Sequence, residues 1–268
     1  MQQLTVLYAF LRRDWLVTVS YRFPIVLELL GTFFSLALFF YLGDLVDPST
    51  KSNGDLERGY FAFAVIGLGI FRIGQIGLNA VGRKFREEQT TGTFEPLFST
   101  SAASWLVVIG NSTFEILRAT VLGIATVGLA MAFFGLRLTG DASAWMVVVI
   151  SLVLAVVLFT ALGVALGAFT VVFKQTTGIV GILLPGLALL SGVYFPVSLL
   201  PQPLQILSDL SPFKWVLDIV RGALLRNEIE LQPFLVLVPA AVLAIPIALA
   251  VFQAALNQAR RAGSLAQY

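Results

Sequence analysis

Residues 144–173 have the sequence AWMVVVISLVLAVVLFTALGVALGAFTVVF, and this stretch decides the fold of the chain. It contains no Asp, Glu, Lys or Arg. A transmembrane helix needs about 20 consecutive, mostly apolar residues. Because a backbone in lipid must satisfy its own polar groups, an apolar run of this length indicates a membrane-spanning helix.

Five more apolar stretches are long enough to span a bilayer, so the sequence predicts six transmembrane helices. The 268 residues are 58% hydrophobic and only 12% charged, whereas a soluble domain carries roughly 25% charged residues. We therefore predict an all-α, polytopic membrane protein with a single transmembrane domain over residues 1–268. The predicted spans are residues 24–45, 60–81, 104–134, 144–173, 177–195 and 233–256.

The chain contains no cysteine and no histidine. Disulfide bonds and thiol chemistry are therefore excluded, and the most common general base and metal ligand is missing. We expect that the chain is not an enzyme, that it carries no catalytic, metal or cofactor site, and that it has no nucleic-acid partner.

Basic residues predict the orientation, because the cytosolic loops of membrane proteins are enriched in Lys and Arg. With the N-terminus inside, more Lys and Arg residues fall in cytosolic segments, such as residues 83–86, than in external ones. The first external loop is acidic and includes Asp47, Asp55 and Glu57. We predict that both termini are cytosolic and that the protein lies in a bacterial inner membrane.

Residues 1–22 precede the first span and predict a helix that lies in the plane of the membrane surface. Arg12 and Arg13 flank its apolar face, as in amphipathic helices that bind membrane lipid. The apolar face consists of Leu4, Leu7, Tyr8, Leu11 and Trp15. A cytosolic tail with chance periodicity is the alternative.

Residues 196–224 lie between spans five and six, and prolines divide them into two short apolar segments. The first contains Leu204, Leu207 and Leu210, and the second contains Trp215. Irregular backbone at membrane depth is tolerated only where protein or a wet cavity surrounds it. We therefore predict short re-entrant helices here.

Residues 87–101 follow the second span on the cytosolic side and predict a short amphipathic helix. Gly92 would end the preceding helix, and the Thr93 oxygen can cap the next one. Glu95 lies in its first turn, where the helix dipole favours an acidic residue. The spacing of its apolar face follows a helical period and consists of Phe94, Leu97 and Phe98. An interfacial loop with no partner is the alternative.

Polar side chains recur inside the predicted spans, where an ionisable group costs about 2.5–3.5 kcal/mol. Three follow one face of span two, and three more lie in spans one and three. They are Arg72, Gln75 and Asn79, then Glu28, Glu115 and Arg118. Two arginines balance two glutamates, so the group is either a structural ion-pair network or the lining of a transport path. The pattern does not identify the glutamate that pairs with Arg72.

Two smaller features also have two interpretations each. Tyr194 and Phe195, at the outer end of span five, are either an aromatic gate or ordinary interfacial aromatic residues. Gly163 and Gly167 form a small-residue pattern that lets helices approach closely. That approach occurs either within one subunit or between two subunits.

Two stretches resemble the ABC-type-2 exporter permeases. EEQTTGTFEPLFST, at residues 87–100, is similar to the cytosolic coupling segment of that family. SGVYFP, at residues 191–196, is similar to the family signature around the fifth span, and the similarity continues into the re-entrant segment. The continuing residues are Leu200, Pro201, Leu204, Leu207, Ser208, Leu210, Ser211, Pro212, Trp215 and residues 221–225. Ser101 stands where many relatives have proline, so the exit of the coupling helix is expected to differ.

The resemblance implies a transport subunit. Such permeases pair with a second copy or a homologous permease, and each docks on a cytosolic ATP-binding subunit that carries ATP and Mg²⁺. The chain itself has no Gly-x-x-x-x-Gly-Lys-Ser/Thr phosphate loop. The residues implied in coupling to the ATPase are Glu87, Glu88, Thr93, Phe94, Glu95, Leu97 and Phe98.

By the same resemblance, the substrate path would run between subunits along spans one, two and five. The substrate would be amphipathic (a lipid, a lipid-linked glycan or a hydrophobic drug) and would leave the cytosol or the inner leaflet. The residues also allow an ion-gradient-driven secondary transporter or channel that needs no ATPase. In that alternative Glu28, Arg72, Glu115 and Arg118 form an ion relay.

Overall fold

The computed structural model describes residues 2–45, 59–93, 96, 104–173 and 177–261. Within these ranges the chain is helical and has no strand, which confirms the prediction of an all-α, polytopic membrane fold. The long helices are α1 (Gln2–Ser20), α2 (Arg22–Leu45), α3 (Tyr60–Thr90), α5 (Ser104–Phe134), α6 (Ala142–Phe173), α7 (Thr177–Leu190) and α10 (Gln232–Arg261). The short ones are the 3₁₀ helix η3 (Val197–Leu199), α8 (Gln202–Ser208), α9 (Pro212–Arg221) and the π-helix η4 (Gly222–Arg226).

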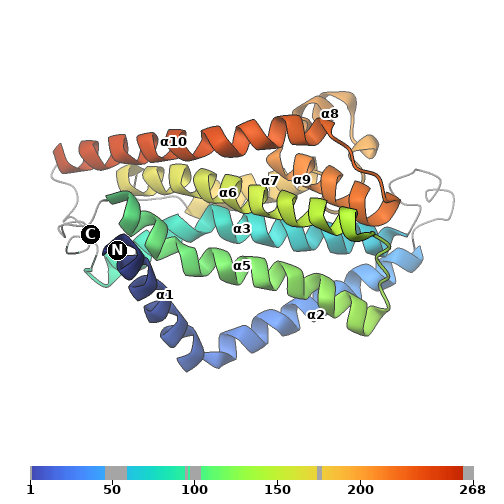
Figure 1. Ribbon diagram of the computed structural model, residues 1–268, viewed down its shortest axis with the longest axis horizontal. Helices are drawn as coiled ribbons and strands as arrows, with labels where there is room; N and C mark the ends of the chain where they lie inside the picture. The colour runs from blue at the N-terminus through green and yellow to red at the C-terminus, as the bar shows by residue number, and fades with distance from the viewer. Residues whose placement is uncertain (1, 46–58, 94–95, 97–103, 174–176, 262–268) are drawn as a thin grey trace.

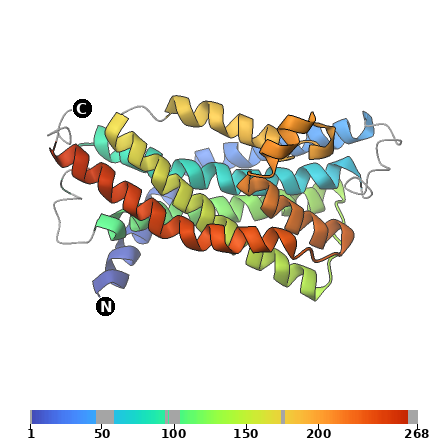
Figure 2. The ribbon, with the colours of Figure 1, turned by 90° about the horizontal axis from the view of Figure 1, so that it is seen from above.

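Five of the described helices, namely α2, α3, α5, α6 and α10, are long and apolar enough to cross a membrane. They extend along the long axis of the molecule, and α1 meets α2 at a sharp corner (Figure 1). The start of α1, the C-terminal end of α3 and the C-terminal end of α10 lie at the same end of the bundle (Figures 1 and 2). We call this the basic end, because it carries Arg13 and residues 83–86.

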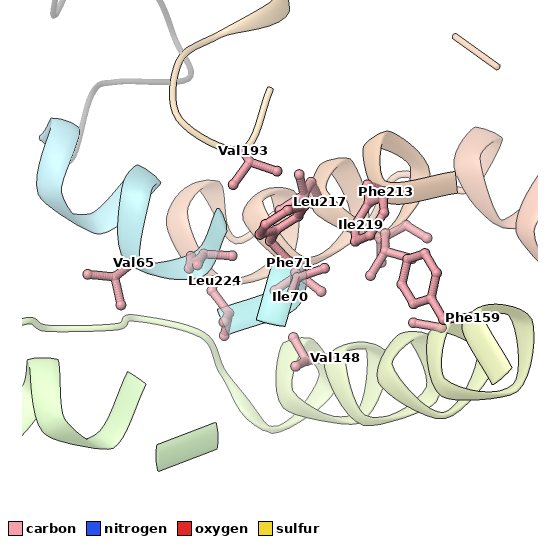
Figure 3. Close-up of a cluster of buried hydrophobic side chains, with 14 of the residues drawn as sticks. Val65, Ile70, Phe71, Val148, Phe159, Val193, Phe213, Leu217, Ile219 and Leu224 are labelled. Atoms are coloured by element: carbon pink, nitrogen blue, oxygen red, sulfur yellow. The ribbon is translucent and has the colours of Figure 1, made fainter. Parts of the chain in front are cut away.

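α3 is the central helix, and 67% of its apolar segment is buried. Part of its core is built around Phe213 of α9, which packs between Phe71 of α3 and Phe159 of α6 (Figure 3). The ring centroid of Phe213 lies 5.4 Å from that of Phe71 and 4.3 Å from that of Phe159. A helix that comes late in the chain therefore completes the core around α3.

Glycines bring α6 close to α3. A Cβ atom added to Gly163 would lie less than 3.0 Å from the carbonyl oxygen of Gly77, and one added to Gly167 would meet the side chain of Val81. Side chains of ordinary size would force these two backbones apart. The structure thus uses the Gly163 pattern for packing within one subunit.

The predicted outer boundary of the fifth span is wrong. α7 ends at Leu190 instead of continuing to residue 195. Gly192 adopts a left-handed φ of 72°, and the Val193 N–H bonds to the Ala188 carbonyl at 3.3 Å. This is the hydrogen bond of a Schellman termination, which a glycine permits without strain. Tyr194 therefore follows the helix in a turn.

The segment after this turn forms η3, α8 and α9, which lie at the end of the bundle opposite the basic end (Figure 2). Their apolar residues have two different environments. Leu210, in the first predicted segment, is 71% exposed, whereas Phe213 and Leu217 of α9 are fully buried. α9 therefore fills the core beside α3 and α6, where α7 has already ended. Whether these helices enter the membrane stays a prediction.

α2 packs sparsely, with only 11% of its apolar segment buried. Aromatic rings make some of its contacts: the ring centroid of Phe40 lies 5.3 Å from that of Phe61 of α3 and 5.3 Å from that of Phe134 of α5. Phe34 and Tyr41 remain mostly exposed. α2 is thus an arm on the side of the bundle, and lipid or a partner must cover its apolar surface.

Candidate functional site

Glu28 of α2 bridges two arginines from neighbouring helices. Its Oε1 atom lies 3.0 Å from Nη2 of Arg72 on α3, and its Oε2 atom lies 3.3 Å from Nη1 of Arg118 on α5. Nη1 of Arg72 also donates to the hydroxyl of Thr32, one turn further along α2. The structure therefore pairs Arg72 with Glu28, which the sequence left open, and fastens α2 to two helices at one point.

A second carboxylate extends this group towards the basic end. Glu115 lies 3.4 Å from Nη2 of Arg118 and also pairs with Nη2 of Arg83. The sequence places Arg83 in a cytosolic segment and does not predict it here. Its position three helical turns after Arg72 puts both on one face of α3, and that spacing is the available signal. We call Glu28, Arg72, Arg83, Glu115 and Arg118 the ion cluster.

The other two predicted polar residues of α3 lie outside these ion pairs. Asn79 donates from Nδ2 to the backbone carbonyl of Gln75 at 2.8 Å, within its own helix. Among the described interactions, neither the Gln75 nor the Asn79 side chain bonds to the ion cluster. Gln75 is exposed and faces the cavity described next.

A cavity of about 350 Å³ opens beside Arg72. It lies between α2 and α3 and reaches Tyr194 in the turn after α7. The Tyr194 ring stacks on the ring of Phe39, with 5.9 Å between the centroids, and meets the ring of Phe71 edge-on, with 6.4 Å between the centroids. The described residues that line the cavity are Glu28, Thr32, Ser35, Leu36, Leu68, Phe71, Arg72, Gln75, Ile76, Thr126 and Tyr194. Phe195, the other predicted gate residue, is half-buried and is not among them.

At the basic end, Glu88 of α3 turns inward and binds α1. Its side chain is only 8% exposed, and Oε1 accepts a hydrogen bond from Nη1 of Arg13 at 3.0 Å. Nη2 of Arg13 donates to Oδ1 of Asn111 on α5 at 2.6 Å. One arginine thus joins the C-terminal turns of α3 to α1 and α5.

A second pair of charges strengthens this junction. Asp14 of α1 is 4% exposed, and Nζ of Lys84 lies 3.5 Å from its Oδ1 atom. Lys84 also lies 3.4 Å from Oε2 of Glu87, which is 60% exposed. Of the two adjacent glutamates predicted for ATPase coupling, Glu87 therefore faces outward and Glu88 faces the bundle. We call Arg13, Asp14, Lys84, Glu88 and Asn111 the N-terminal clasp.

α3 ends where the sequence predicts a break. Gly92 has a φ of 74°, and the Thr93 N–H bonds to the Glu88 carbonyl at 2.9 Å. The Thr93 hydroxyl bonds back to the Glu88 carboxylate and to the Thr91 hydroxyl. Glu88 therefore links the helix end to the clasp. The remaining predicted coupling residues, Phe94, Glu95, Leu97 and Phe98, lie outside the described residues.

The clasp leads to a first prediction. Arg13→Gln removes the arginine that pairs with the buried Glu88, and we expect the free energy of unfolding to fall by about 1–3 kcal/mol, the cost of leaving a buried polar group without its partner. Thermal unfolding of the purified chain in detergent measures the change. Arg12→Gln is the matched control, since Arg12 is the neighbouring exposed arginine. Equal stability of the two variants would contradict the assignment.

These arrangements can now be compared with known proteins. A family model described as ABC-2 type transporter matches residues 5–225, which include most of α1 and all of α2, α3, the ion cluster and α9. A search of curated proteins finds no match. Because the match covers most of the chain, it establishes the family, and with it the role of a membrane-embedded permease component of a transporter. The chain belongs to the ABC-2 type transporter family.

Proposed function

We propose that this chain is the permease subunit of an ATP-driven exporter in a bacterial inner membrane, with both termini in the cytosol. It moves an amphipathic substrate, such as a lipid, a lipid-linked glycan or a hydrophobic drug, outward from the cytosol or the inner leaflet. ATP and Mg²⁺ bind a separate cytosolic subunit, because the chain has no phosphate loop. The family match supports the permease role.

One observation carries the mechanism: α3 is a continuous helix from the cavity to the clasp. Its 31 residues extend over about 46 Å at 1.5 Å per residue. Arg72 lines the cavity in its middle, and Glu88 holds α1 in its last turns. A push on the segment that follows Gly92 therefore moves α3, α1 and the wall of the cavity together.

The cavity supports the proposed path. It is lined by α2, by α3 and by Tyr194 in the turn after α7, which correspond to spans one, two and five of the resemblance. The sparse packing of α2 leaves the surface that a second permease, either another copy or a homologous chain, would cover. In this proposal Tyr194 closes the outer end of the cavity against Phe39.

Affinity purification of the tagged chain from its native membrane tests this function. We expect a stoichiometric partner that contains a phosphate loop, and vanadate-sensitive ATP hydrolysis by the complex. If the chain purifies alone and transports in liposomes with only an ion gradient, the exporter is rejected in favour of a secondary transporter.

The coupling segment gives a second prediction. In the reconstituted complex, alanine at Phe94, Leu97 and Phe98 removes the apolar face of the predicted coupling helix. We expect ATP hydrolysis to continue while transport falls at least tenfold, because the ATPase loses its apolar contact with the permease. The matched control replaces three exposed apolar residues at the opposite end with alanine, namely Leu199, Ile206 and Leu210. Normal transport by the first variant would contradict the coupling role.

A further inference from the structure

The cavity beside Arg72 is lined by both polar and apolar side chains. Glu28, Thr32 and Arg72 are among the polar ones, and Leu68 and Phe71 are among the apolar ones. A ligand that fills such a cavity buries an apolar body and places a polar group on the arginine. This arrangement fits an amphiphile, and the charges of the ion cluster indicate the sign of its polar group.

The ion cluster carries more positive than negative charge. Arg72, Arg83 and Arg118 face two carboxylates, Glu28 and Glu115. Each carboxylate is already shared between two arginines. The side chains of Arg72 and Arg118 are only 21% and 24% exposed, so bulk water screens them weakly. An additional anion at this point would balance the charge.

The guanidinium groups also retain unused donors. Among the described residues, the buried Nε atoms of Arg72 and Arg118 have no hydrogen-bond partner. Glu28 offers two oxygens, one to each arginine. A phosphate-like group offers three oxygens around a tetrahedral phosphorus, and the planar fork of a guanidinium group can bind two of them at once. It would therefore bind both arginines together.

We propose that Arg72 and Arg118 bind the phosphate-like oxyanion of an amphiphilic substrate, which takes the place of the Glu28 carboxylate. This inference rests on the proposed export function and names the substrate class for its path. Release of Glu28 frees α2 from its ion pairs on α3 and α5, so that the arm can move aside as the substrate enters. When the substrate leaves, Glu28 returns to the two arginines.

The same geometry argues against a cationic amphiphile. A cation would need a carboxylate free of arginine, and both glutamates of the cluster are paired. A free phosphate ion would satisfy the arginines as well, but it would leave the apolar side chains of Leu68 and Phe71 uncovered. The test therefore compares an alkyl phosphate, inorganic phosphate and an alkyl cation.

The experiment is a titration of the full-length permease in dodecyl maltoside, without the ATPase subunit, with dodecyl phosphate as the probe. A ligand that binds the folded state raises the unfolding temperature, and the concentration dependence gives its dissociation constant. We expect Glu28→Gln to bind dodecyl phosphate about tenfold more tightly, because the competing carboxylate is gone. We expect Arg72→Gln to bind it about tenfold more weakly, and Arg118→Gln serves if Arg72→Gln does not fold. The matched control, Arg137→Gln, changes an exposed arginine outside the cluster and should bind as the wild type does.

The two neutral variants are expected to change the affinity in opposite directions, which distinguishes binding from a structural role. If the ion pairs only hold helices together, both variants lose stability and bind dodecyl phosphate equally, and the proposal is overturned. Equal stabilisation by inorganic phosphate would overturn the amphiphile, and stabilisation by dodecyltrimethylammonium would overturn the anion. No ATPase takes part in the titration. A negative titration therefore rejects the anion site alone, whereas a missing ATPase partner in the affinity purification rejects the export function.

Discussion

Arg221→Met should destabilise the chain by about 3–5 kcal/mol, because three backbone carbonyls lose a buried, charged hydrogen-bond donor. Arg221 of α9 is only 6% exposed. It donates to the carbonyl of Gly192 at 2.8 Å, to that of Phe63 at 3.0 Å and to that of Val193 at 3.2 Å. Its guanidinium carbon also lies 3.4 Å from the centroid of the Phe63 ring. Methionine fills similar space but donates no hydrogen bond, so these carbonyls lose their charged donor.

Thermal unfolding in detergent checks this prediction, and we expect the unfolding temperature to fall by about 10 °C or more. Arg221→Lys keeps the charge but loses the planar fork, so its stability should be intermediate. Arg226→Met is the matched control, because Arg226 pairs with Glu228 and Glu230, whose side chains are 64% and 43% exposed. Equal stability of the Arg221 and Arg226 methionine variants would refute the structural role of Arg221.

Gly163→Val should also be strongly destabilising, by about 3 kcal/mol, because overpacking a tight contact forces the backbone to shift. The atoms nearest to a Cβ at Gly163 belong to the backbone of Gly77 and Leu78. A helix backbone cannot move aside as a flexible side chain can, so α6 must separate from α3. We expect a lower unfolding temperature and less folded protein in the membrane fraction.

Gly128→Val separates this steric effect from the general cost of valine in a helix. Gly128 lies inside α5, and a Cβ added there meets no atom within 4 Å. Because valine has a slightly better helix propensity than glycine, this variant should unfold close to the wild-type temperature. If both variants unfold at the same temperature, the close approach of α3 and α6 contributes little. If Gly163→Val instead dissociates an oligomer without changing the stability of the subunit, the glycine acts between subunits.

The sequence predicts the fold well because its strongest signal is local. An apolar run such as residues 144–173 requires a helix in lipid, whatever its neighbours are. The end of α7 is less predictable, since Gly181, Gly186 and Gly192 all follow one another in the same apolar region. Only Gly192 adopts a positive φ among these three. Tertiary contacts select it, since the carbonyls of residues 192 and 193 bind Arg221.

The site is predicted in part. The composition of the spans identifies Glu28, Arg72, Glu115 and Arg118 as embedded charges, but pairing depends on how α2, α3 and α5 are placed beside one another. The N-terminal clasp is not predicted, because the apolar periodicity of residues 1–22 indicates only the apolar face of the helix, which is the exposed one. Tyr8 and Trp15 are 66% and 60% exposed, whereas the opposite face buries Asp14. A buried aspartate at position 14 is explained only by the ion pair with Lys84, and the sequence alone does not show that pair.

The ion cluster also bears on how the chain enters the bilayer during synthesis. Glu28 is made first, then Arg72 and Arg83, and finally Glu115 and Arg118 within one helix, so each later charge except Arg83 meets an earlier one of opposite sign. An unpaired ion at mid-membrane would cost about 2.5–3.5 kcal/mol on insertion scales. This order lets Glu28 of α2 stabilise α3 as α3 inserts, and lets charges of α2 and α3 stabilise α5 in the same way.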